Sequence, residues 1–82
     1  MDGNHTEIVE ALRAAGASVQ SLAAVHGGCP DLLVGYRGTN HVIEVKDGGS
    51  FTPMQKAWHR DWQGKAHVAN SVEDALLIVG AK

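Results

Sequence analysis

Residues 30–46, PDLLVGYRGTNHVIEVK, contain two short apolar runs with a turn sequence, RGTN, between them. This arrangement predicts two paired β-strands, DLLVGY and HVIEV, in the interior of a sheet. Three ionisable residues lie at the ends of these strands, namely Asp31, Glu44 and Lys46. Ionised groups are costly to bury without partners, so their position in a sheet calls for a chemical explanation.

Pairing of the two strands predicts that the three ionisable side chains share one face. A turn over residues 37–40, or a two-residue turn at 38–39, places Asp31 opposite Lys46 and Leu33 opposite Glu44. Directly opposed residues point to the same face, as do residues two apart on one strand. Asp31 and Glu44 then become diagonal neighbours roughly 7–8 Å apart, close enough for both to reach one cation.

Two carboxylates beside a lysine have a specific chemical use. Carboxylate oxygens are the ligands that Mg²⁺ and Mn²⁺ prefer, and a lysine can hold a water molecule or stabilise developing negative charge. Such a set suits metal-assisted hydrolysis of a phosphodiester. The pattern D…ExK is short and common, however, and on its own it is explained more readily by an ordinary ion pair between Lys46 and either Asp31 or Glu44.

The remaining segments predict three helices and two further strands. Asn4, with Glu7 as its capping-box partner, begins a helix that Gly16 ends, and ASVQSLA forms a strand. Thr52, Pro53 and Gln55 are a strong helix start, and Gly64 ends that helix. AHVAN is a short strand, and Ser71 caps the final helix, VEDALLIVGA. The predicted order is α-β-β-β-α-β-α, a mixed α/β fold.

Composition is consistent with one small cytoplasmic domain over residues 1–82. The hydrophobic fraction is 44%, and the single cysteine, Cys29, excludes an intramolecular disulfide framework. No stretch is long enough to cross a membrane, and the N-terminus lacks the apolar run of a signal peptide. The net charge of −2 excludes a general polycation, although Lys56, Arg60 and Lys65 could contact phosphates locally. An ordinary solvated helix face explains these three cations equally well.

Large apolar side chains predict self-association. Met54, Trp58 and Trp62 recur at four-residue steps, where they could stack on bases or, more commonly, pack in a core or an oligomer contact. The C-terminal ALLIVGA is apolar on more than one helical face, and a domain this small hides little apolar surface. We therefore expect a two-fold symmetric homodimer, whose paired active sites could cut a symmetric DNA such as a four-way junction.

Taken in order, GCPDLLVGYRG, HVIEVKDG, FTPMQKAWHRDW and SVEDAL resemble the VRR-NUC family of the PD-(D/E)xK nuclease superfamily. The resemblance runs from about Asn4 to Val79 and is closest to the minimal form associated with viruses and prophages. It implies a restriction-endonuclease-like αβββαβ core with a C-terminal helix, its mixed sheet flanked by helices. It also implies a bacterial host cell and a phage or prophage origin.

The resemblance also implies site residues. The metal ligands would be Asp31, Glu44, the backbone carbonyl of Val45 and the helical Glu7. Lys46 would be the catalytic lysine, and Gln55 would hold that lysine or a water molecule. Relatives often carry a tyrosine where this chain has His59, which leaves the role of that position open.

These observations predict a Mg²⁺-dependent DNA endonuclease, with Mn²⁺ as a substitute, that acts on Holliday-type junctions as a homodimer. The alternative is a structure-selective DNA-binding module without significant catalysis. A purely structural oligomerisation domain is a further alternative, which predicts that no metal binds.

Overall fold

The computed structural model describes residues 4–82; residues 1–3 of the predicted domain lie outside the described residues. Its elements are α1 (His5–Ala14), β1 (Ser18–Ser21), β2 (Leu32–Tyr36), β3 (Thr39–Val45), α2 (Pro53–Asp61), β4 (His67–Ala69) and α3 (Val72–Val79). This order confirms the predicted α-β-β-β-α-β-α sequence of elements and the mixed α/β class.

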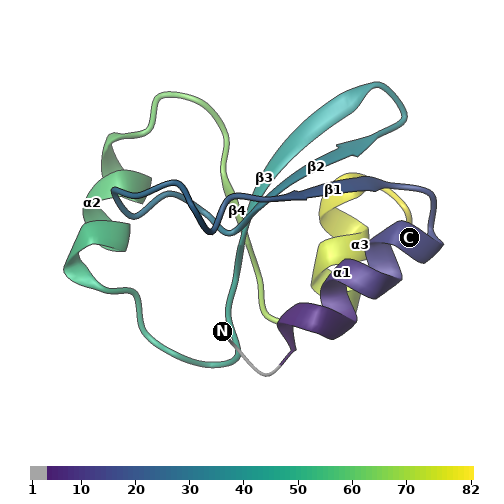
Figure 1. Ribbon diagram of the computed structural model, residues 1–82, viewed down its shortest axis with the longest axis horizontal. Helices are drawn as coiled ribbons and strands as arrows, with labels where there is room; N and C mark the ends of the chain where they lie inside the picture. Colours follow the sequence, from purple (N-terminus) through teal and green to yellow (C-terminus); the bar gives the residue numbers. More distant parts are fainter. Residues whose placement is uncertain (1–3) are drawn as a thin grey trace.

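The four strands form one sheet in the order β1-β2-β3-β4. The first three strands are antiparallel to their neighbours, whereas β4 runs parallel to β3. Parallel neighbours need a crossover connection, and α2 lies in that connection. In Figure 1, α1 and α3 lie side by side on one side of the sheet, and α2 lies on the other side beside the segment that follows β1.

The hydrophobic core lies between the sheet and the pair α1 and α3. Alternate residues of β2 and β3 supply its sheet side, namely Leu32, Val34, Ile43 and Val45. Ile8 and Leu12 of α1 and Ala75 and Val79 of α3 cover them, and all eight residues are buried. Glu44, between Ile43 and Val45, therefore points to the opposite face of the sheet.

The turn between β2 and β3 differs from both predicted forms. It consists of Arg37 and Gly38, whose φ angles of 48° and 81° are those of a type I′ turn, the form that matches the twist of a hairpin. Leu32 pairs with Ile43, so the predicted register was wrong by two residues. If the observed pairing is extended by one residue before Leu32, the first residue of β2, then Asp31 lies opposite Glu44. Because the shift is even, the predicted common face of Asp31, Glu44 and Lys46 is retained.

The start of α2 is confirmed in detail. The side chain of Thr52 accepts a hydrogen bond from the backbone N–H of Gln55, the Gln55 side chain accepts one from the Thr52 N–H, and Pro53 occupies the first turn. The predicted end at Gly64 was wrong, because Trp62 already has extended backbone angles and closes the helix.

The capping box predicted for α1 was also wrong. Asn4 is the N-cap residue, but its side chain makes no capping hydrogen bond. Its Nδ2 instead donates to the carbonyl oxygens of Lys46 and Asn70, at 3.0 and 2.8 Å. The start of α1 is therefore tied to the ends of β3 and β4. Ser71 does cap α3, by accepting a hydrogen bond from the N–H of Asp74.

No residue of α2 is buried. Trp58 and Trp62 are absent from the buried core cluster of residues 4–82, which excludes the core interpretation of this apolar stripe. The helix is instead held against the segment between β1 and β2. Gly28, at φ 80°, approaches it so closely that an added Cβ would lie 2.5 Å from the carbonyl oxygen of Met54.

Candidate active site

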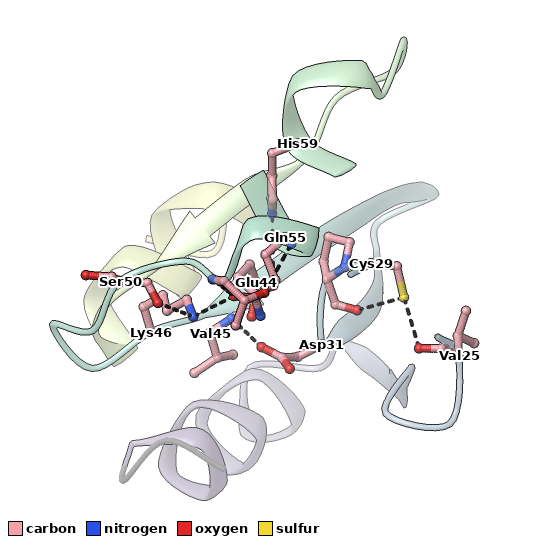
Figure 2. A network of polar contacts seen from close by, with 11 residues as sticks. Val25, Cys29, Asp31, Glu44, Val45, Lys46, Ser50, Gln55 and His59 are labelled. Carbon is pink, nitrogen blue, oxygen red and sulfur yellow. Dashed lines mark hydrogen bonds and ion pairs between the residues drawn. The ribbon is translucent and has the colours of Figure 1, made fainter. Parts of the chain in front are cut away.

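Five of the predicted site residues meet at one cavity of about 380 Å³, namely Asp31, Glu44, Val45, Lys46 and Gln55. Its lining comprises His5, Ser21, Ala23, Asp31, Glu44, Val45, Lys46 and Gln55. The strand end of β3 supplies the ExK segment, the loop before β2 supplies Asp31, and the first turn of α2 supplies Gln55. Figure 2 shows these side chains converging from the three segments.

A backbone hydrogen bond holds Asp31. Its Oδ2 accepts from the N–H of Val45 at 2.8 Å, so the carboxylate lies across the end of β3. This bond brings Asp31 next to Glu44 and Lys46, the two residues that flank Val45 in the chain. The position of Asp31 is thus set by the same strand end that carries the other two ionisable groups.

Glu44 is almost completely buried, with 1% of its surface exposed. Its Oε1 lies 3.9 Å from Nε2 of His59, close enough for an ion pair if the imidazole is protonated. Burial, followed by the positive charge of Lys46, lowers the pKa of His59, which favours the neutral imidazole. The His59 ring also stacks on Phe51, with centroids 4.9 Å apart. His59 thus lies against the Glu44 carboxylate.

Two oxygen atoms fix the Lys46 ammonium group. Its Nζ donates to Oε1 of Gln55 at 3.1 Å and to the carbonyl oxygen of Ser50 at 3.3 Å (Figure 2). The ammonium also lies 5.1 Å from the centre of the Phe51 ring, within cation–π range. The same Gln55 oxygen accepts from the Thr52 N–H at 2.9 Å. Gln55 therefore both caps α2 and holds the lysine, which unites the two explanations that the sequence offered.

The first helix contributes a residue that sequence reasoning missed. Glu7 is exposed and does not line the cavity, whereas His5 does. His5 precedes Ile8 by three residues and Leu12 by seven, so it lies on the helical face that packs on the sheet. Glu7 is rotated about 100° away from Ile8. That helical phase was the signal that could have identified His5.

The donor set fits a magnesium ion that keeps much of its water. Across residues 4–82 no group of three or more His, Cys, Asp or Glu side chains is arranged to hold a metal. Asp31, Glu44 and the Val45 carbonyl nevertheless supply oxygen atoms at one cavity. Mg²⁺ commonly binds through one or two carboxylates and retains several waters, so this set is sufficient.

A nearby thiol responds to the same negative charge. Burial, then the charges of Glu44 and Asp31, raise the pKa of Cys29. Its Sγ donates to the carbonyl oxygens of Val25 and Pro30, each at 3.6 Å (Figure 2). Part of the rise in the Cys29 pKa therefore comes from two carboxylates that line the cavity.

The three predicted phosphate contacts lie outside the cavity. Lys56, Arg60 and Lys65 are exposed, on α2 and just after it. Arg60 forms a two-point pair with Asp61, with Nε and the second guanidinium nitrogen 2.8 and 2.9 Å from the carboxylate oxygens. The structure therefore places these cations beside the site and not within it.

No family model, curated protein or solved structure gives a significant match to this chain. Within residues 4–82, no helix has the length and apolarity needed to cross a membrane.

Proposed function

We propose that this chain is a metal-dependent DNA endonuclease that hydrolyses phosphodiester bonds. The observation that carries the proposal is the meeting of Asp31, Glu44, Lys46 and Gln55 at one cavity, with the lysine held by the glutamine. A surface ion pair, the simpler alternative, would leave Glu44 at the surface. Glu44 is instead 1% exposed, and its Oε1 lies 3.9 Å from Nε2 of His59.

Each residue has a role in this proposal. Asp31, Glu44 and the Val45 carbonyl would hold Mg²⁺ or Mn²⁺, which would supply Lewis-acid chemistry and lower the pKa of a bound water. Lys46 donates hydrogen bonds to the attacking water or to the phosphate oxygens on which charge develops. Gln55 keeps Lys46 in place. Glu7 remains a prediction of the family resemblance, without support from the cavity lining.

The finer parts of the proposal rest on the sequence. The VRR-NUC resemblance supports a nuclease core and a preference for branched DNA. Leu77 of α3, with 54% of its surface exposed, supports an apolar contact between two copies. A two-fold dimer with two sites would suit a Holliday-type junction. The turn at Arg37 and Gly38 and the cap of α3 are compatible both with a monomer and with this dimer.

Cleavage of a panel of junction, flap and duplex DNAs tests the enzyme directly. Wild type should cleave with Mg²⁺ or Mn²⁺ and lose all activity in excess chelator. Lys46→Met keeps much of the aliphatic stem but removes the donor, so its rate should fall about 10²–10³-fold. Lys82→Met is the matched control, because Lys82 is exposed and pairs with Glu73.

The proposal would be wrong if wild type cleaved DNA at an unchanged rate in excess chelator, or if Lys46→Met cleaved at the wild-type rate. DNA binding by wild type without any metal-dependent cleavage would instead establish the non-catalytic DNA-binding module.

Calorimetric titration with Mn²⁺ tests the metal site without reference to activity. Asn at position 31 can still accept the Val45 hydrogen bond through its amide oxygen, but it lacks the charge. Asp31→Asn should therefore remain folded and lose at least about tenfold in Mn²⁺ affinity. Equal affinities of the variant and wild type would remove Asp31 from the ligand set.

A further inference from the structure

The outer surface of α2 forms a groove with an aromatic wall. Its volume is about 320 Å³, and its lining comprises Gly27, Met54, Ala57, Trp58, Asp61 and Trp62. The rings of Trp58 and Trp62 stack on each other, with centroids 4.6 Å apart and planes 15° apart. Trp62 is 49% and Met54 63% exposed. These two apolar side chains therefore remain at the surface.

We propose that this groove binds an unpaired nucleobase, so that the preferred substrate is DNA with an unpaired segment at or near the cleavage site. The inference rests on the proposed nuclease function. An exposed indole offers a flat face on which any base can stack, whereas the bases of an intact duplex are already stacked on each other. The groove thus favours single strands, flaps and branch points over plain duplex.

The segment that carries most of the groove has more cations than carboxylates, which suits a nucleic acid, although none of the cations lines the groove itself. Although the whole chain has a net charge of −2, three cations (Lys56, Arg60 and Lys65) and one carboxylate (Asp61) lie between residues 53 and 67. That carboxylate is already paired with Arg60, and the pairing lowers the pKa of Asp61. Lys56 and Lys65 then supply net positive charge for the phosphates that flank a bound base.

The groove and the proposed active site are built from the same two segments of the chain. One wall is α2, which also carries Gln55, the residue that holds Lys46. The other wall includes Gly27, in the segment that leads to Asp31. The close contact of Gly28 with the Met54 backbone fixes the two walls together. A base in the groove would therefore lie within about one helix diameter, 10–12 Å, of the cavity.

Intrinsic fluorescence measures occupancy directly, because Trp58 and Trp62 are the two tryptophans of the sequence. Wild-type protein in excess chelator, where cleavage is blocked, is titrated with oligothymidylate and with a blunt duplex of equal length. The single strand should quench the fluorescence at a concentration at least about tenfold lower than the duplex, since it offers unpaired bases without an extrusion cost. Equal concentrations for the two DNAs would overturn the proposal.

Variants of Trp62 test whether the single-stranded DNA binds at the groove. Trp62→Ala should weaken binding of labelled oligothymidylate by about 5- to 150-fold, the equivalent of 1–3 kcal/mol per stacked base. Trp62→Phe should recover most of the affinity, because a phenyl ring also stacks. Leu33→Ala, which removes an exposed apolar side chain from β2, is the matched control and should bind like wild type.

Two outcomes separate the possible failures. If Trp62→Ala converts a dimer into a monomer and leaves oligothymidylate affinity unchanged, the groove is a contact between copies and the base site is refuted. If the base site behaves as expected but Lys46→Met still cleaves at the wild-type rate, the base site stands and the proposed catalytic role of Lys46 fails.

Discussion

The two faces of the sheet are built on different principles. On one face, Ile43 and Val45 belong to an apolar cluster with residues of α1 and α3. On the other face, Glu44 is covered by α2, a helix without a buried residue of its own. Hydrogen bonds and ring contacts hold that helix, including the bond from Lys46 to Gln55 and the stack of Phe51 on His59.

This difference separates stability from chemistry. Apolar burial supplies most of the free energy of folding, at roughly 25 cal/mol per Å². The face with α2 contributes little of this and instead positions polar groups. Substitutions on the first face should therefore unfold the protein, and substitutions on the second should change binding or cleavage while the fold persists.

The largest effect on stability should come from Leu12→Ala. Leu12 is completely buried against the sheet, so its truncation should lower the free energy of unfolding by about 2–5 kcal/mol. Met54→Ala, on the exposed side of α2, should change it by no more than about 0.5 kcal/mol. Urea unfolding measures both. A similar cost for the two variants would show that α2 is part of the core, and the contrast between the faces would be lost.

Local signals in the sequence predicted the elements well. Capping by Thr52 and Ser71 depends on residues a few positions apart, and both caps are present. The site triad was predicted for a similar reason, because period-two alternation fixes the face of Asp31, Glu44 and Lys46 even after a register error of two residues.

The wrong predictions concern positions where the local sequence is compatible with more than one structure. Arg37 adopts a positive φ of 48°, which is uncommon for a residue with a side chain, so the centre of the turn was predicted one residue too late and the strand register shifted by two. The Asn4 side chain does not cap α1 but donates hydrogen bonds to the carbonyl oxygens of Lys46 and Asn70. These residues lie 42 and 66 positions away in the chain. No pattern within one helix could show that long-range preference. The choice of His5 over Glu7 at the cavity is different, because the helical phase of α1 could have shown it.

A smaller effect is expected at Asn4, which joins the two faces at the site end of the sheet. Asn4→Ala removes two hydrogen bonds to backbone carbonyls and should lower the free energy of unfolding by about 1–2 kcal/mol. Asn70→Ala is the control, because Asn70 participates through its backbone oxygen, which the substitution retains. If both variants cost the same in urea unfolding, the Asn4 side chain does not connect α1 to the strand ends.

The smallest effect should be a pH dependence of the free energy of unfolding, which arises from His41 on the core face of β3. His41 pairs with Val34 in the sheet, and its ring lies 6.2 Å from that of His67. Its buried Nε2 has no hydrogen-bond partner among residues 4–82. Burial, and then the proximity of His67, lower the pKa of His41 below its ordinary value of 6.5. The unfolded chain then binds more protons than the folded chain just below that pH.

The sign follows from this difference in bound protons. The contribution of His41 to stability is fully present above pH 6.5 and is lost as the pH falls from there through the lower folded pKa. Urea unfolding at about pH 7.5 and about pH 5.5 should show a decrease for wild type. His41→Phe keeps an aromatic ring but cannot titrate, so its decrease should be smaller. His26→Asn, at an exposed loop position, should show the full wild-type decrease. An undiminished decrease in His41→Phe would mean that the pH dependence comes from other histidines, and the core face would then contain no titrating group of consequence at β3.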